Sequence, residues 1–133
     1  MKKPAIAEAK DIERFFDAFN THDWNAIFNY MSEDCVWDAS DRRLEGRQNI
    51  IDYWTKYHAA FKETLGEPEK IVFGDHMVYL QVKIHLNFLE DGTFYGKAYK
   101  KGETLDFACA DYYELNDEGK IESGCVYTKF FTP

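Results

Sequence analysis

The sequence has little cysteine, and its three cysteines form no recognisable pattern. Cys35, Cys109 and Cys125 are odd in number and include no C-x-x-C pair, which argues against a disulfide framework and against a zinc ribbon. Reduced thiols are typical of the cytoplasm, where we expect this protein to reside.

Long apolar runs and an excess of positive charge are also missing. No stretch approaches the roughly 20 apolar residues of a membrane-spanning helix, and the charged N-terminus lacks the apolar segment of a signal peptide. The 24 acidic residues outnumber the 16 basic ones, which gives a net charge of -8. Because such a chain repels phosphate groups, we expect neither nucleic acid nor a membrane as a partner.

Familiar signatures of metal, nucleotide and nucleophile chemistry are missing too. The four histidines do not share metal-ligand spacing, and neither H-E-x-x-H nor G-x-S-x-G occurs. The glycines are scattered, so no phosphate-binding loop is indicated. We therefore expect no metal ion and no cofactor.

What the chain does contain is ample apolar and aromatic material. Its 133 residues are 45% apolar and 17% aromatic, which is enough for one core. We expect a single domain over residues 1–133. Flat aromatic side chains also line small-molecule pockets, so a small-molecule ligand is the expected partner.

The first half of the chain predicts three helices. Residues 5–20 repeat apolar side chains at helical spacing. Asp23 is suited to cap a short second helix. A third helix is expected over about residues 47–65, because several side chains step along one face at spacings of three or four: Ile50, Trp54, His58, Phe61 and Leu65.

The rest of the chain predicts strands. Residues 77–89 alternate between two kinds of side chain, as a strand with one buried face does. Further strands are expected at residues 35–39, 71–73, 94–99, 105–115 and 121–131. Helices first and an antiparallel sheet last indicate an α+β fold. We expect the three N-terminal helices to pack on one face of a curved, mostly antiparallel sheet, which would enclose a cone-shaped cavity.

Asp111 is the residue that most indicates a site. It shares one face of its predicted strand with otherwise apolar or aromatic side chains: Leu105, Phe107, Cys109, Tyr113 and Leu115. An unpaired carboxylate on a buried face is costly to keep ionised. Two interpretations stay open: a pocket carboxyl with a raised pKa that acts as acid, base or donor, and a structural aspartate satisfied by a backbone amide or water.

Three segments, "FFDAFNTHDWNAIFNYMSEDCVWDAS", "LEGRQNIIDYW" and "DYYELNDEGKI", resemble the nuclear-transport-factor-2-like superfamily. Its SnoaL-like and ketosteroid-isomerase-like branches are the most similar. The resemblance implies a cone-shaped α+β barrel with a pocket at its wide end, and frequently a homodimer. The polar strand face over residues 79–87 is where a second copy would pack. Members of the superfamily include isomerases, cyclases, dehydratases, epoxide hydrolases and proteins without catalysis, so fold does not fix function.

The resemblance also implies roles for single residues. Asp38 falls at the position of the isomerases' general base, and Asp111 at that of the protonated aspartate that donates to an oxyanion. The oxyanion-binding tyrosine of the first helix is replaced by Phe15. In SnoaL-like cyclases an acid/base aspartate on the same late strand again corresponds to Asp111. Asp38 has a second interpretation, a loop-edge carboxylate paired with Arg42 or Arg43.

The remaining candidates would form the pocket wall. Trp54 and Tyr127 are expected liners, because the superfamily places the third helix and last strand against the cavity. Tyr30 is a candidate for supplying the hydroxyl that Phe15 lacks. His58 is either a hydrogen-bonded core residue or a pocket residue.

Together these features predict a protein that binds a small, flat, largely apolar molecule. Cofactor-free proton transfer, isomerisation or cyclisation would be its chemistry. The alternative is a non-catalytic binding or dimerisation protein of the same fold.

Overall fold

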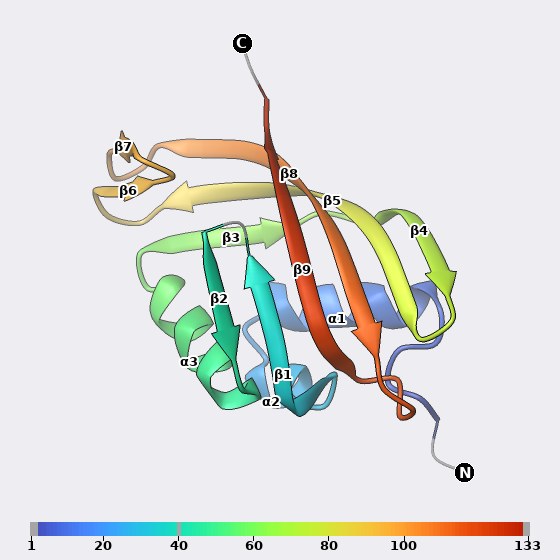
Figure 1. Cartoon of the computed structure of the whole chain (residues 1–133). Coiled ribbons are helices and arrows are strands. Elements are labelled where there is room, and N and C mark those ends of the chain that lie inside the picture. The colour runs from blue at the N-terminus through green and yellow to red at the C-terminus, as the bar shows by residue number, and fades with distance from the viewer. Residues whose placement is uncertain (1–2, 40, 132–133) are drawn as a thin grey trace.

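A seven-stranded sheet curls around the first helix, as the computed structural model of residues 3–39 and 41–131 shows (Figure 1). The strand order is β2-β1-β9-β8-β5-β3, and β4 also pairs with β5. All pairs are antiparallel except β1 with β9. A separate β6–β7 hairpin stands at one end of the sheet. The expected α+β fold with a curved, mostly antiparallel sheet is confirmed.

The helices and strands have the following bounds. The helices are α1 (Ala9–Asn20), α2 (Trp24–Phe28) and α3 (Arg47–Tyr57). The first strands are β1 (Met31–Ala39), β2 (Arg42–Glu45), β3 (Phe61–Leu65) and β4 (Glu69–Gly74). The later strands are β5 (Met77–Phe88), β6 (Gly92–Phe94), β7 (Lys97–Tyr99), β8 (Thr104–Leu115) and β9 (Ile121–Phe130).

Helix α1 begins four residues later than the periodicity predicts, at Ala9 rather than residue 5. The backbone amides of Ala5 and Ile6 donate instead to carbonyls of the β8–β9 turn, at 2.9 and 3.0 Å. The carboxylate of Asp11 then accepts from the backbone amide of Glu8 at 3.1 Å, which satisfies one of the free donors at the helix start.

Helix α3 ends at Tyr57, so the prediction of a helix to residue 65 is wrong for residues 58–65. Phe61–Leu65 forms strand β3 and pairs with β5, with Phe61 opposite Phe88 and Leu65 opposite Ile84. Two apolar residues four positions apart fit both a helical face and alternate positions of a strand, so the spacing alone does not decide between them. The middle inward position of β3 is Glu63.

Strands β5 and β8 carry the strongest alternation in the chain. All inward side chains of β5, from Val78 to Phe88, are buried, as expected. In the antiparallel register Asp111 of β8 lies opposite Leu80 of β5 and Val126 of β9. Because paired residues share a face of the sheet, Asp111 points to the concave side, toward α1.

Other stretches differ from their predicted limits. The expected strand at residues 35–39 begins at Met31, and the polar segment after it forms β2. The expected single strand at residues 94–99 is the second half of the β6–β7 hairpin, which turns at Tyr95 and Gly96. Both turn residues have positive φ, 49° and 78°, as tight hairpin turns require.

Gly124 of β9 leaves the space that Trp37 of β1 occupies. A Cβ at this position would lie 2.5 Å from the indole ring of Trp37. We expect Gly124→Ala to lower the free energy of unfolding by about 1–3 kcal/mol, because the ring must move within a packed core. Urea unfolding followed by circular dichroism measures this.

Gly92→Ala is the matched control, because nothing lies within 4 Å of a Cβ there and its φ is not positive. Equal stability of the two variants would contradict the proposed packing of Trp37 over Gly124.

Within the described part of the chain, no helix is long and apolar enough to cross a membrane.

Candidate functional site

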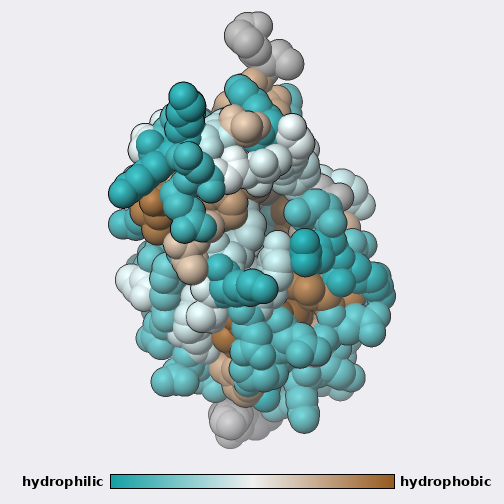
Figure 2. Space-filling model, turned by 90° about the vertical axis from the view of Figure 1, so that its left-hand side faces the viewer, coloured by the Kyte–Doolittle hydropathy of each residue, from teal (hydrophilic) through white to brown (hydrophobic). Residues whose placement is uncertain are grey.

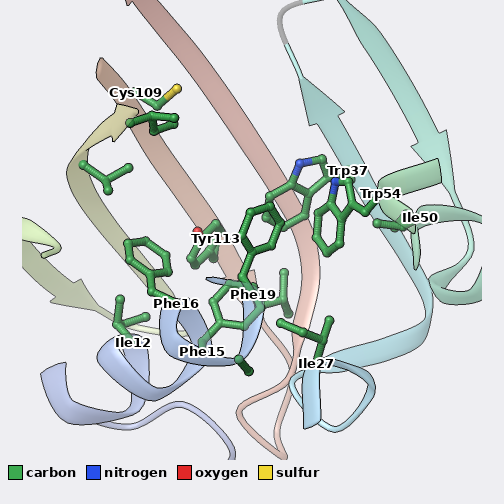
Figure 3. Packing of buried hydrophobic residues seen from close by; sticks show 14 of the residues in the cluster. Ile12, Phe15, Phe16, Phe19, Ile27, Trp37, Ile50, Trp54, Cys109 and Tyr113 are labelled. Carbon is green, nitrogen blue, oxygen red and sulfur yellow. The ribbon is translucent and has the colours of Figure 1, made fainter. Parts of the chain in front are cut away.

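A cavity of about 130 Å³ lies between α1, α3 and the concave face of the sheet. Engineered cavities of about 150 Å³ hold a benzene ring, so this one suits a single small ring system. Most of its wall is aromatic: Phe15, Phe16, Phe19, Trp37, Tyr53, Trp54, Tyr57, Phe94, Tyr95, Phe107 and Tyr113. Figure 3 shows the phenylalanines of α1 reaching toward Tyr113, with Trp37 and Trp54 beside them.

The cavity reaches the surface near the β6–β7 turn and the β1–β2 connection. Its exposed lining residues, Asp41 and Tyr95, belong to these two segments. Figure 2 looks onto this side of the molecule, where polar groups cover most of the surface and apolar groups show in the recesses between them. The cavity is therefore polar at its opening and mostly aromatic in its interior.

Asp111 is the most deeply buried carboxyl of the wall. Its residue is 6% exposed, and Oδ2 accepts a hydrogen bond from the Tyr113 hydroxyl at 2.6 Å. Oδ1 is buried without a hydrogen-bond partner in residues 3–39 and 41–131. An unsatisfied buried oxygen beside a cavity is a point at which a ligand can bind.

The protonation of Asp111 follows from this environment. Burial raises the pKa of its carboxyl from 3.8 to about 7, and the negative charge of Glu63 adds to the rise. The hydrogen bond from Tyr113 acts in the opposite direction on this pKa. Near pH 7 the carboxyl therefore exists in both forms, which suits an acid/base group.

Tyr113 supplies a hydroxyl within the wall that Phe15 does not. It follows Asp111 by two residues and shares its face of β8, and the rings of Tyr113 and Phe15 meet edge to face at 6.0 Å. Burial raises the pKa of Tyr113 well above its ordinary value, so the hydroxyl stays protonated and donates to Asp111.

Glu63 is a further carboxyl of the wall, facing the cavity from β3. Its Oε2 lies 3.3 Å from Nε2 of His58, which stands just after α3. The side chain of His58 is 2% exposed and is not itself part of the wall.

The structure brings only some of the expected site residues together. Asp111, Phe15 and Trp54 line the cavity, and His58 contacts a lining residue from behind. Tyr30 packs on Phe15 with ring centroids 5.4 Å apart, but does not reach the cavity.

Asp38 and Tyr127 face away from the cavity, in contrast to the expected roles of base and liner. Both neighbours of Asp38 in β1, Trp37 and Ala39, line the cavity, so alternation turns Asp38 to the outer face. Tyr127 stands between the lining residues of β9 in the same way and is 66% exposed.

Sequence reasoning missed two carboxyls of the wall, Glu63 and Asp41. Glu63 was hidden by the wrong assignment of residues 61–65 to a helix, and Asp41 lies in a segment that showed only a polar loop.

The electrostatic character of the wall is one-sided. Asp41, Glu63 and Asp111 contribute carboxyls, whereas no lysine, arginine or histidine occurs among the described lining residues. No three metal-ligating side chains gather at one point in the described ranges. The site therefore has the character of an aromatic pocket with acidic groups.

Comparison with known proteins assigns the chain to a family. A profile described as the SnoaL-like domain matches residues 12–123. No curated protein sequence gives a significant match. The profile match confirms the resemblance carried by the three sequence segments.

Solved structures show the same fold at low sequence identity. A protein of Pseudomonas putida provisionally described as a polyketide cyclase is 19% identical, with a TM-score of 0.77 and 92% of each chain covered. A similarly described protein of Xanthomonas campestris is 21% identical, with a TM-score of 0.74 over 87% of this chain and 85% of that one. An LEH-like epoxide hydrolase of M. tuberculosis is 14% identical, with a TM-score of 0.70 over 89% and 79%. At these identities the likeness shows the fold alone.

Proposed function

The chain belongs to the SnoaL-like domain family, and from this premise we propose that it binds a small, flat, uncharged aromatic molecule and catalyses cofactor-free proton transfer on it. The transfer would lead to isomerisation or cyclisation. The observation that carries this proposal is Asp111, a buried carboxyl whose Oδ1 is unpartnered at the wall of an aromatic cavity. Proteins provisionally described as polyketide cyclases share the fold, which supports the same class of chemistry.

The proposed chemistry uses Asp111 in its protonated form. A ligand carbonyl oxygen that meets Oδ1 would receive a hydrogen bond from the neutral carboxyl, and negative charge that develops on this oxygen would be stabilised. Tyr113 holds the other carboxyl oxygen through the 2.6 Å hydrogen bond and so fixes the direction of Oδ1. A carboxyl with a pKa of about 7 gives and regains a proton readily at neutral pH.

The charge of the wall predicts which ligands bind. Phenylacetone carries an aromatic ring and an enolisable ketone, and phenylacetate has the same skeleton with a negative charge. We expect neutral aromatic ketones such as phenylacetone to raise the melting temperature, and matched carboxylates such as phenylacetate to leave it unchanged, because the lining carboxyls repel anions.

A thermal-shift series with such matched pairs measures this prediction. Equal effects of ketones and carboxylates would contradict the electrostatic part of the proposal. A complete lack of response across a panel of neutral aromatic ketones would contradict the ligand pocket itself.

A non-catalytic binding protein is the second candidate function. It is favoured by Phe15, which brings no hydroxyl to the wall, and by Asp38, which faces away from it. Such a protein would bind phenylacetone without exchanging its protons, so binding and turnover separate the two candidates.

The proposal includes a cytoplasmic homodimer. The outer face of the sheet carries half-buried aromatic and small side chains, including Tyr79, Ala110 and Tyr112, next to the exposed Tyr127. This face is compatible with a second copy, as the family resemblance implies. The cysteines in the described ranges are unpaired, which suits a reducing compartment.

A further inference from the structure

We propose that Glu63, held in position by His58, is the general base that works together with Asp111. This inference rests on the proposed function, because a base is needed only if a proton is transferred. It assigns to β3 the role that sequence comparison gives to Asp38, which lies on the outer face.

Glu63 reaches the cavity because of its place in β3. It stands between the inward residues Phe61 and Leu65, lines the cavity and has a side chain that is 17% exposed. Strand β3 pairs with β5, and β5 pairs with β8 (Figure 1). Glu63 and Asp111 lie opposite inward residues of β5, so both project from the concave face of the curled sheet. The charge of Glu63 contributes to the raised pKa of Asp111 and of Cys109, so its field extends across the cavity.

His58 fixes the direction of the Glu63 carboxylate. Its ring lies parallel to that of His22, with centroids 4.9 Å apart, and Phe19 packs edge-on against it at 5.1 Å. These contacts fix the orientation of the imidazole ring of His58. Its Nε2 lies 3.3 Å from Oε2 of Glu63. A neutral imidazole with its proton on Nε2 donates to the carboxylate and leaves Nδ1 as a bare lone pair. This form agrees with the buried Nδ1, which has no partner in the described structure.

Asp41 is the other carboxyl at the wall, and it fits the role less well. It is exposed, whereas Glu63 is partly buried and anchored by a buried side chain. A base that is shielded from water and oriented in advance transfers protons more efficiently than a solvated one.

The proposed step is balanced without any further reactant. The Glu63 carboxylate removes a proton from the carbon next to a ligand carbonyl, and the C–H electron pair forms the double bond of an enol. The carbonyl π electrons move to oxygen, which receives the proton of Asp111. Asp111 then takes its proton back from the enol oxygen while Glu63 returns a proton to the carbon, which restores the ketone. In D₂O the protonated Glu63 first exchanges its proton for a deuteron of the solvent, so the ketone is deuterated at this carbon.

The test is the exchange of phenylacetone protons for deuterium, followed by proton NMR. We expect Glu63→Gln to lower the exchange rate by about 100-fold or more. Asp106→Asn is the matched control, because Asp106 forms a similar pair with His85 on the outer face, at 2.7 Å. It should exchange at the wild-type rate.

His58 needs a readout that a purely structural role would not change. The amide of His58→Gln can donate from a position close to Nε2, whereas His58→Leu cannot. We expect His58→Leu to lower kcat about tenfold with little change in KM, and His58→Gln to recover most of the loss. Equal kcat values in the two variants would overturn the positioning role.

A carbon NMR titration of Asp111 makes the inference testable without turnover. Because the charge of Glu63 helps to raise the pKa of Asp111, Glu63→Gln should lower this pKa, and an unchanged value would overturn the inference. Wild-type exchange in Glu63→Gln together with loss in Asp111→Asn would overturn the role of Glu63 and leave the proposed function intact. No exchange by the wild-type protein would overturn the catalytic part of the proposed function, and with it the role of Glu63.

Discussion

Asp111→Asn is expected to lower the rate of phenylacetone proton exchange by about 100- to 10,000-fold. The asparagine side chain nearly matches aspartate in shape and still fits beside Tyr113, whose hydroxyl lies 2.6 Å from Oδ2 in the wild-type protein. It cannot give a proton to a developing enolate and take it back. The loss therefore measures acid/base chemistry rather than the shape of the pocket.

Asp38→Asn is the matched control for this measurement. Asp38 lies on β1 with its side chain on the outer face, so its replacement leaves the wall of the cavity unchanged. Binding of phenylacetone, measured by thermal shift, should persist in Asp111→Asn even where exchange is lost. A normal exchange rate in Asp111→Asn would show that Asp111 is a structural residue and would favour the non-catalytic binder.

Asp111 could be found from the sequence because it lies inside a long strand. The alternation from Leu105 to Leu115 fixes which face each side chain takes, and a single polar residue on the apolar face is conspicuous. The same alternation in β5 made the α+β fold predictable. Two long strands in which buried and exposed side chains alternate regularly define a sheet with one buried face.

Asp38 shows why the rest of the site could not be predicted in this way. Its predicted strand was short, and in a short strand an error of one position turns every side chain to the other face. The resemblance to the family suggested that Asp38 faces the cavity. The indole of the preceding residue, Trp37, points inward beside Gly124, so Asp38 points outward. Tyr127 was placed by family position alone, and the pairing of Val126 with Asp111 turns it outward.

Glu63 was hidden for a different physical reason. A helical face and a strand face both accept apolar residues four positions apart, so Phe61 and Leu65 continued the pattern of α3. Residues 61–65 form a strand because they pair with β5, which is a contact between distant parts of the chain. Propensity and periodicity do not contain such contacts, and the second carboxyl of the wall depends on them.

The contribution of Asp111 to the stability of the protein should fall as the pH rises from about 4 to 7, and Asp111→Asn should remove this contribution. The pKa of Asp111 is 3.8 without its folded environment and about 7 within it. Between these values the unfolded chain releases the proton while the folded protein retains it. The unfolded state then binds fewer protons, so the free energy of unfolding decreases with rising pH and levels off above the folded value.

The size of the effect follows from the two pKa values. Above pH 7 the ionised, buried carboxyl costs the folded state about 4 kcal/mol, and somewhat more than half of this cost develops between pH 5 and 8. Urea unfolding of the wild-type protein and of Asp111→Asn at these two pH values measures the difference, in which the titration of all other groups largely cancels. Asp38→Asn should follow the wild-type curve.

The combination of both Asp111→Asn results distinguishes a functional carboxyl from a structural one. A structural aspartate would be stabilised by its partners as the ion, and its replacement would destabilise the protein at every pH. A carboxyl that serves the ligand is kept at the expense of stability, so the variant should gain stability relative to the wild type as the pH rises, while it loses exchange activity. A stability difference that is constant between pH 5 and 8 would contradict the buried, unpartnered state of Oδ1, on which the proposed function depends.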